Sequence, residues 1–251
     1  MTETKLFFKN SKNQNICGIL NKSNKNTKHI VILVHGLASH KNRSSTKSLS
    51  LELFKKNISS FRIDLNGCGE SEGEFANHTI SNAVDDIISA INFMKSKHYE
   101  IFDLFGSSAG GLAVMATALK YSNLNKIALK APVSDYFSKL IQKYSQETLN
   151  KWKKLGYIDY QVTPDFKLKL NYSFFEDIKK YTMYDQVNNI KCPVLIIHGI
   201  DDNVVEIQQS KKLVKNLSNG ELIALPNADH SLEINGDRSN SLKLFVDFFQ
   251  N

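Results

Sequence analysis

Cysteine and arginine are both scarce in this sequence. The three cysteines, Cys17, Cys68 and Cys192, form an odd number and no Cys-x-x-Cys pair, which argues against a disulfide framework and a cysteine zinc site. A reducing compartment, the cytoplasm, is therefore expected. Only three of the 32 basic residues are arginine, the side chain whose forked donors suit phosphates and bases. Because the lysines are scattered despite a net charge of +7, we expect no nucleic-acid partner.

Long apolar runs are also missing. The uncharged segment 104–119 contains three glycines and is shorter than the ~18 residues expected of a spanning helix. Near the N-terminus only three consecutive residues are apolar, where a secretory signal needs about 7–15. We therefore expect neither a membrane span nor an export signal.

Short apolar runs alternate along the chain with segments of helical periodicity. This alternation is typical of a mostly parallel sheet covered by helices. With 251 residues and a hydrophobic fraction of 41%, the sequence predicts a single α/β domain over residues 1–251, with an eight-stranded, mostly parallel sheet. The expected strands are 6–8, 16–20, 30–34, 60–65, 101–105, 127–131, 194–198 and 221–225, and the expected helices are 80–91, 112–119, 207–217 and 242–249.

One connection between expected strands is far longer than the ~2–6 residues usual in α/β units. It spans residues 134–189 and is rich in tyrosine and phenylalanine, with the single tryptophan, Trp152. We interpret it as an inserted cap that folds against the main body. No internal repeat or interdomain linker is visible.

A Gly-x-Ser-x-Gly motif lies between an expected strand and an expected helix. It reads Gly106-Ser107-Ser108-Ala109-Gly110, in the strand, turn and helix context that a nucleophile elbow requires. A serine on such a tight turn needs neighbours without bulky side chains, which Gly106 and Gly110 provide. Ser108 is therefore the candidate nucleophile.

A serine hydroxyl becomes a good nucleophile only when a base removes its proton, so a histidine and an orienting acid are needed. Asp202 follows the expected strand 194–198, and His230 follows the strand 221–225. Both loops leave the carboxyl ends of strands, where ligands gather in open α/β sheets. Taken alone, Asp202 could cap a turn and His230 could be a surface histidine. The joint pattern favours an acid and a base.

The expected strand 30–34 is followed by His35, Gly36 and Leu37. An oxyanion hole takes one backbone donor from this loop and one from the residue after the nucleophile. We therefore predict the N–H groups of Leu37 and Ala109 as the oxyanion donors. A histidine directly after a buried strand is more often a hydrogen-bonded structural residue, and this reading applies to both His35 and His198.

Five motifs are spread along the chain: Val-Ile-Leu-Val-His35-Gly36, the loop Asp64-Leu-Asn66-Gly67-Cys68-Gly69-Glu-Ser71-Glu-Gly73, the Ser108 elbow, His198-Gly-x-x-Asp202-x-x-Val205 and Ala228-Asp229-His230. Together they resemble the α/β-hydrolase superfamily, and more narrowly the small bacterial feruloyl/cinnamoyl-esterase-like and serine-aminopeptidase-like hydrolases. The order Ser, Asp, His also matches that superfamily. The resemblance implies Ser108 as nucleophile, His230 as general base and Asp202 as its orienting acid. Such a mechanism needs no metal or organic cofactor.

Two positions depart from the narrower pattern. Feruloyl-type esterases usually carry histidine where this chain has Ser107 and Cys68, so feruloyl specificity is not expected. Cys68 is interpreted as a packing or loop residue, because nothing in the sequence around it would lower its pKa.

The sequence thus predicts a serine hydrolase that cleaves a small-molecule carboxylic ester or thioester through an acyl-enzyme on Ser108. An aminopeptidase-like amidase is the first alternative, and it requires a carboxylate that holds a substrate amine. A non-catalytic binding protein on the same fold is the second. The oligomeric state is not indicated. Candidate amine anchors in the insertion are Glu147, Asp159, Asp165 and Glu176.

Overall fold

A computed structural model describes residues 3–24, 27–234 and 238–250 of the chain. Eight strands form one sheet in the order β1-β2-β4-β3-β5-β6-β9-β10, in which β1, β2 and β4 pair antiparallel and all other neighbours pair parallel. The predicted eight-stranded, mostly parallel sheet is confirmed. The strands are β1 (Glu3–Lys9), β2 (Asn15–Asn21), β3 (His29–Val34), β4 (Ser59–Ile63), β5 (Ile101–Ser107), β6 (Lys126–Lys130), β9 (Val194–Gly199) and β10 (Gly220–Leu225).

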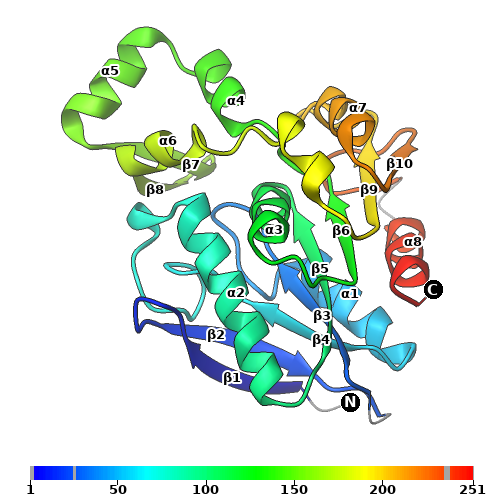
Figure 1. The fold of residues 1–251 in the computed structure, drawn as a ribbon. Helices are drawn as coiled ribbons and strands as arrows, with labels where there is room; N and C mark the ends of the chain where they lie inside the picture. Colours follow the sequence, from blue (N-terminus) through cyan, green and yellow to red (C-terminus); the bar gives the residue numbers. More distant parts are fainter. Residues whose placement is uncertain (1–2, 25–26, 235–237, 251) are drawn as a thin grey trace.

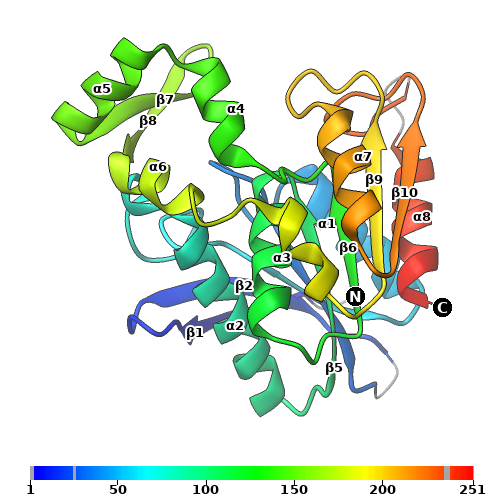
Figure 2. The same ribbon diagram turned by 45° about the horizontal axis from the view of Figure 1, so that its top comes forward.

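Helices cover both faces of the sheet (Figures 1 and 2). Strand β3 shows why both faces attract them: Ile30, Ile32 and Val34 join one buried cluster, while Val31 and Leu33 join the other. Alternate side chains of a strand point to opposite faces, so an unbroken apolar run buries both. One face carries α2 (Ile80–Ser96), α3 (Ala109–Lys120) and α7 (Ile207–Asn216), and the other carries α1 (Ser44–Lys55) and α8 (Ser239–Gln250).

The predicted helices are present as α2, α3, α7 and α8, but α1 was not predicted from the sequence. Helix α1 begins with Ser44, Ser45 and Thr46, residue types that compete for backbone hydrogen bonds and weaken the helical signal. Packing forms this helix instead, because Leu49 and Leu53 are fully buried against the sheet.

The inserted segment, residues 134–189, has secondary structure of its own. Figures 1 and 2 show most of it standing beyond the carboxyl edge of the parallel strands, above α2 and α3. Trp152 is fully buried at its centre and donates from its indole N–H to the Leu170 carbonyl at 3.0 Å. The segment contains α4 (Tyr136–Lys143), α5 (Gln146–Leu155), the antiparallel pair β7 (Tyr157–Thr163) and β8 (Phe166–Asn171), α6 (Tyr172–Ile178), and the short 3-10 turns Met183–Asp185 and Val187–Asn189.

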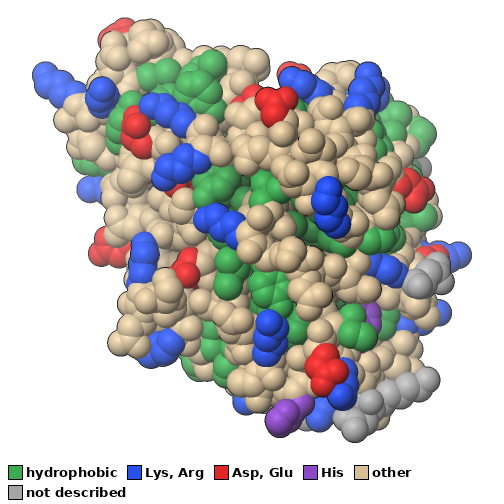
Figure 3. Space-filling view, in the orientation of Figure 1, with side chains coloured by type: hydrophobic (Ala, Val, Ile, Leu, Met, Phe, Trp, Pro, Cys, Tyr) green, Lys and Arg blue, Asp and Glu red, His purple; other side chains and the backbone are tan. Residues whose placement is uncertain are grey.

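Basic side chains are dispersed over the face shown in Figure 3 and do not gather in one patch. Among the described helices, none is both long enough and apolar enough to cross a bilayer. All three cysteines are free thiols, two of them buried.

Candidate active site

Ser108 occupies the sharp turn between β5 and α3. Its backbone has φ 55° and ψ −120°, a strained conformation for a residue with a side chain. The surrounding backbone holds the turn: Ser108 N–H donates to the Lys130 carbonyl at 2.9 Å, and the Ser108 carbonyl accepts from Val133 N–H at 3.1 Å. The half-buried serine is thus fixed at the carboxyl end of the central strand.

The two motif glycines allow α3 to pack directly on the strands. A Cβ on Gly106 would lie 2.6 Å from the Gly110 carbonyl oxygen, and one on Gly110 would lie 2.3 Å from the His35 carbonyl oxygen. Real Cβ atoms do not approach backbone so closely, so both positions require glycine. The sequence argument for small neighbours around Ser108 agrees with this geometry.

His230 and Asp202 come together from two loops, as the sequence predicted. His230 Nδ1 lies 2.7 Å from Asp202 Oδ2. The loops are joined by a hydrogen bond from Asp201 N–H to the Ala228 carbonyl at 3.0 Å. A Cβ on Gly199 would lie 2.1 Å from that same carbonyl oxygen. The acid and the base are therefore held as one unit.

The Asp202 carboxylate is buried but fully hydrogen-bonded. Its Oδ1 accepts from the backbone N–H groups of Val204 and Val205, each at 2.8 Å, and its Oδ2 also lies 3.0 Å from His198 Nε2. Burial by itself would raise the pKa of Asp202, but the hydrogen bonds from His198, His230 and Val205 outweigh it and hold the pKa below its usual range. Asp202 is therefore an anion at neutral pH, and it favours an Nδ1–H tautomer of His230.

Ser108 and His230 line the same cavity, whose volume is about 1120 Å³. Within the described residues no hydrogen bond links the Ser108 hydroxyl to the His230 ring. Such contacts are often long or poorly aligned before substrate binds. The cavity is lined by residues of the sheet edge and of the inserted segment, among them Leu37, Tyr136 and Tyr160.

The predicted oxyanion donors lie next to Ser108. Gly36 packs on Ser108, since a Cβ at residue 36 would lie 3.3 Å from Ser108 Cβ, and Leu37 follows it on the cavity wall. Ala109 opens α3, where the first backbone N–H groups have no partner within the helix. The assignment of Leu37 and Ala109 as donors stays a prediction.

The two strand-end histidines are hydrogen-bonded and buried, in line with the structural role expected for them. His35 Nε2 accepts from Leu65 N–H at 3.0 Å, and its Nδ1 lies 2.7 Å from the Gly36 carbonyl. Burial lowers the pKa of His35 to about 4, so it is neutral at pH 7. His198 Nδ1 lies 2.7 Å from Ser210 Oγ. The contact of His198 with Asp202 was not predicted, although a histidine four residues before the acid was a visible signal.

Lys130 is a second residue that the sequence argument missed. It ends β6, is only 7% exposed, and donates from Nζ to the His230 carbonyl at 2.8 Å. Burial, followed by the charge of Arg238, lowers the pKa of Lys130 to about 8. A lysine directly after the apolar run Ile127–Leu129 was the available signal. Its ammonium group braces the loop that carries His230.

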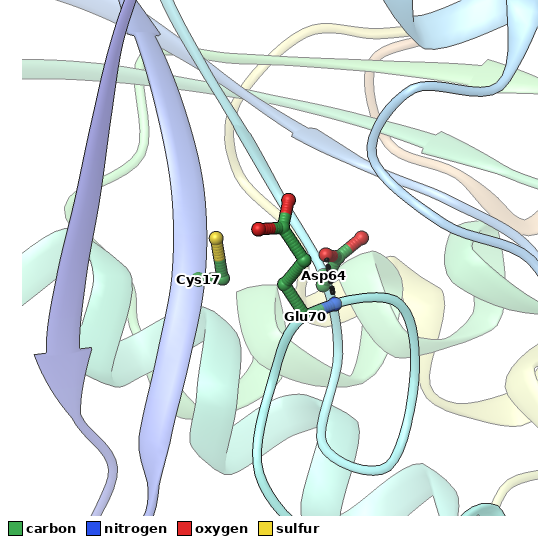
Figure 4. A group of neighbouring side chains, drawn as sticks. All are labelled: Cys17, Asp64 and Glu70. Atoms are coloured by element: carbon green, nitrogen blue, oxygen red, sulfur yellow. Dashed lines mark hydrogen bonds between the residues drawn. The ribbon is translucent and has the colours of Figure 1, made fainter.

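One cluster elsewhere has the donor types of a metal site. Cys17, Asp64 and Glu70 come together where β2 meets the loop after β4 (Figure 4). The Lys41 ammonium already occupies this place, with Nζ 2.5 Å from Asp64 Oδ2 and 2.8 Å from Glu70 Oε1. Glu70 also pairs with Lys5, so the two carboxylates are balanced by the ammonium groups of Lys41 and Lys5.

The candidate residues of the alternative functions are placed differently. Within the part of the chain that the structure describes, none of Glu147, Asp159, Asp165 and Glu176 lines the cavity beside Ser108. Cys68 is buried in the core beneath its loop, and burial raises the pKa of its thiol to about 12. The four candidate amine anchors are thus not placed at the cavity, and the burial of Cys68 agrees with a packing role.

The profile of the family described as serine aminopeptidase, S33, matches residues 25–183. The palmitoyl-protein thioesterase ABHD10 of Bos taurus is 23% identical over 218 residues, covering 82% of this chain and 68% of the relative. The monoacylglycerol lipase ABHD6 of Mus musculus is 24% identical over 263 residues, covering 87% and 74%. Among solved structures, Est1E of Butyrivibrio proteoclasticus with bound ferulic acid superposes with a TM-score of 0.82 at 20% identity, covering 98% of this chain and 96% of that one.

Proposed function

The chain belongs to the serine aminopeptidase S33 family of α/β-hydrolases, and from this we propose that it is a serine hydrolase that cleaves carboxylic ester or thioester bonds through an acyl-enzyme on Ser108. The observation that carries the proposal is one cavity that holds both a strained serine and a histidine bonded to a buried carboxylate. The relatives named above are a thioesterase and a lipase, which favours ester-type bonds over amides.

In the proposed mechanism His230 takes the Ser108 proton as the hydroxyl attacks the acyl carbon. Asp202 keeps the His230 ring in the tautomer that leaves Nε2 free to accept, and it stabilises the imidazolium that forms. The backbone N–H groups of Leu37 and Ala109 stabilise the oxyanion. His230 then returns the proton to the leaving group, and water attacks the acyl-enzyme by the same route in reverse.

We also propose that residues 134–189 act as a cap over the acyl site, since the cavity beside Ser108 takes part of its lining from α4 and β7. The prediction of a cytoplasmic location is supported by the three unpaired cysteines, which a reducing compartment would preserve.

The proposal is tested by labelling with a fluorescent serine-directed phosphonate, together with a panel of acyl esters, acyl thioesters and aminoacyl anilides. The wild type should be labelled and should hydrolyse esters or thioesters faster than anilides. Ser108→Ala should lose the label and several orders of magnitude in kcat. Ser96→Ala, at an exposed serine outside the cavity, is the matched control. Labelling that persists in Ser108→Ala refutes the assignment, and faster cleavage of anilides selects the amidase alternative.

A further inference from the structure

The cavity beside Ser108 carries an excess of positive charge. Among the described residues, six lysine and arginine side chains line it, against three carboxylates. Few aliphatic side chains take part. The cations are Arg43, Lys130, Lys139, Lys143, Lys212 and Arg238, the carboxylates are Asp135, Glu206 and Asp229, and the aliphatic residues are Leu37, Ala38, Leu140, Val162 and Val204.

Most of the opposing carboxylates are already engaged elsewhere. Asp135 caps α4 and accepts from Ser138 N–H at 2.9 Å and from its hydroxyl at 2.7 Å. Asp229 accepts from the N–H and the hydroxyl of Ser231 at 2.8 and 2.6 Å. Burial lowers the pKa of Lys139, and the charges of Asp202 and Glu206 oppose that shift in part. Glu206 forms no ion pair within the described residues. The neutral donors hold Asp135 and Asp229 in place without removing their charge, and Arg238 is paired with Glu233. Five cations then remain against the three carboxylates, so the lining keeps a net positive charge.

Three of the lysines are held over tyrosine rings that line the same cavity. Their Nζ atoms lie 6.0 Å from the ring centre of Tyr136 for Lys139, 5.7 Å from that of Tyr160 for Lys143, and 3.9 Å from that of Tyr184 for Lys212. Within the described residues, none of the three has an ion-pair partner. A cation–π contact orients an ammonium group without neutralising its charge.

The three pairs come from elements that converge on the carboxyl edge of the sheet. Lys139 and Lys143 are one turn apart on α4, so they share a face of that helix, and Lys212 lies on α7. Lys139 also donates from Nζ to the Val204 carbonyl, which connects α4 to the loop that carries Asp202. Figure 2 shows α4 and α7 flanking the end of the sheet. Lys139, Lys143 and Lys212 thus line the cavity that also holds Ser108.

We propose that the ester or thioester substrate carries an anionic group, a carboxylate or a phosphate, bound by Lys139, Lys143 and Lys212. This inference rests on the proposed function and narrows its substrate class. A long alkyl chain fits the cavity poorly, because it would displace water from ammonium groups without supplying a counter-charge. The palmitoyl and monoacylglycerol substrates in the names of the relatives would therefore not be the preferred ones here.

The test compares matched anionic and neutral esters. For the acyl side the pair is mono-p-nitrophenyl adipate and its methyl ester, and for the leaving group it is 4-acetoxyphenyl phosphate and 4-acetoxyanisole. For one of the two pairs, wild type should show a kcat/KM about tenfold or more higher for the anionic member than for the neutral member. Which pair shows this preference tells whether the anionic group belongs to the acyl side or to the leaving group. The preference should shrink as salt is raised.

Each of Lys139→Gln, Lys143→Gln and Lys212→Gln should lower the anionic preference, measured as the ratio of kcat/KM for the anionic and the neutral member of a pair, about fivefold, the size of one partly exposed ion pair. Lys143→Arg should keep the preference. Lys151→Gln, an exposed lysine of α5 outside the cavity, is the matched control and should behave as wild type.

Equal kcat/KM values for charged and neutral esters, or an anionic preference that survives all three Lys→Gln changes, would overturn the inference while phosphonate labelling of Ser108 still upheld the hydrolase. Absence of both labelling and ester cleavage in wild type would instead reject the proposed function, and this inference with it.

Discussion

Replacing Asp202 with asparagine should lower kcat/KM about ten-thousandfold while leaving the fold intact. The reason is that the two carboxylate oxygens of Asp202 have different partners. Oδ1 accepts from Val204 N–H and Val205 N–H, so an asparagine must keep its carbonyl oxygen there. Its NH2 group then takes the place of Oδ2, facing His230 Nδ1 at 2.7 Å and His198 Nε2 at 3.0 Å.

An amide donor at that place stabilises the opposite tautomer of His230. Nδ1 becomes the acceptor and the proton moves to Nε2, which can no longer take a proton from Ser108. A wrong tautomer in a serine protease of another fold reduces kcat by ~10⁴, which corresponds to about 5.5 kcal/mol of lost transition-state stabilisation. Because Oδ1 keeps both of its hydrogen bonds, the effect on unfolding should be far smaller.

Steady-state hydrolysis of p-nitrophenyl esters measures the loss, and thermal unfolding followed by circular dichroism verifies that Asp202→Asn is folded. Asp201→Asn, at the exposed acid one residue earlier, is the matched control and should retain activity. Activity of Asp202→Asn within tenfold of wild type would show that this carboxylate does not set the tautomer of His230, and the reasoning from its two oxygens would be wrong.

Two further substitutions test the frame around the site. Lys130→Met should stabilise the protein by roughly 2 kcal/mol at pH 7. A pKa lowered from ~10.4 to about 8 in the fold means that folding opposes the charge of Lys130 by about 3 kcal/mol below that pH, and loss of the hydrogen bond to the His230 carbonyl offsets about 1 kcal/mol of this gain. The gain should vanish as pH rises from 8 toward the unfolded pKa of ~10.4. Urea unfolding at pH 7 and pH 10 measures this difference in stability. The kcat of Lys130→Met should also fall, because the loop of His230 loses its hydrogen bond from Lys130. A variant less stable than wild type at pH 7 would contradict the predicted sign. Gly106→Ala should lower the free energy of unfolding by about 3 kcal/mol or more, since its Cβ would lie 2.6 Å from the Gly110 carbonyl oxygen. Gly156→Ala should lower it by only about 1 kcal/mol, because a Cβ there meets nothing within 4 Å and only the φ of 82° is unfavourable. Equal urea midpoints for the two variants would refute the steric argument.

The sheet could be predicted because its strands carry a dense local signal. β3 is an apolar run buried on both faces, and a strand of that kind can be predicted from its own residues, without knowledge of the strands beside it. Ser108, Asp202 and His230 could be picked out as candidate site residues for a similar reason, since each follows a predicted strand. The contact between Asp202 and His230 is long-range, but topology requires it once both loops leave the same sheet edge.

The interior of the inserted segment could not be predicted in the same way. Its helices and its β-hairpin depend on aromatic packing around Trp152, where Tyr144, Tyr172 and Phe175 surround the indole ring. Such a cluster leaves no clear period of two or 3.6 residues in the sequence. The buried ammonium of Lys130 was missed because a lysine is normally exposed. Only the fold shows that the His230 carbonyl accepts a hydrogen bond from it.

The inserted segment supplies walls to the cavity, yet Ser108, Asp202 and His230 all lie outside it. Under the proposed function, part of the substrate selection then lies on a stretch of polypeptide that carries none of the reacting side chains. Substitutions at cavity-lining positions of β7, such as Tyr160 and Val162, would change which substrates enter while the contact between Asp202 and His230 stays as it is. Lys139 is the exception, because its hydrogen bond to the Val204 carbonyl ties the inserted segment to the loop of Asp202.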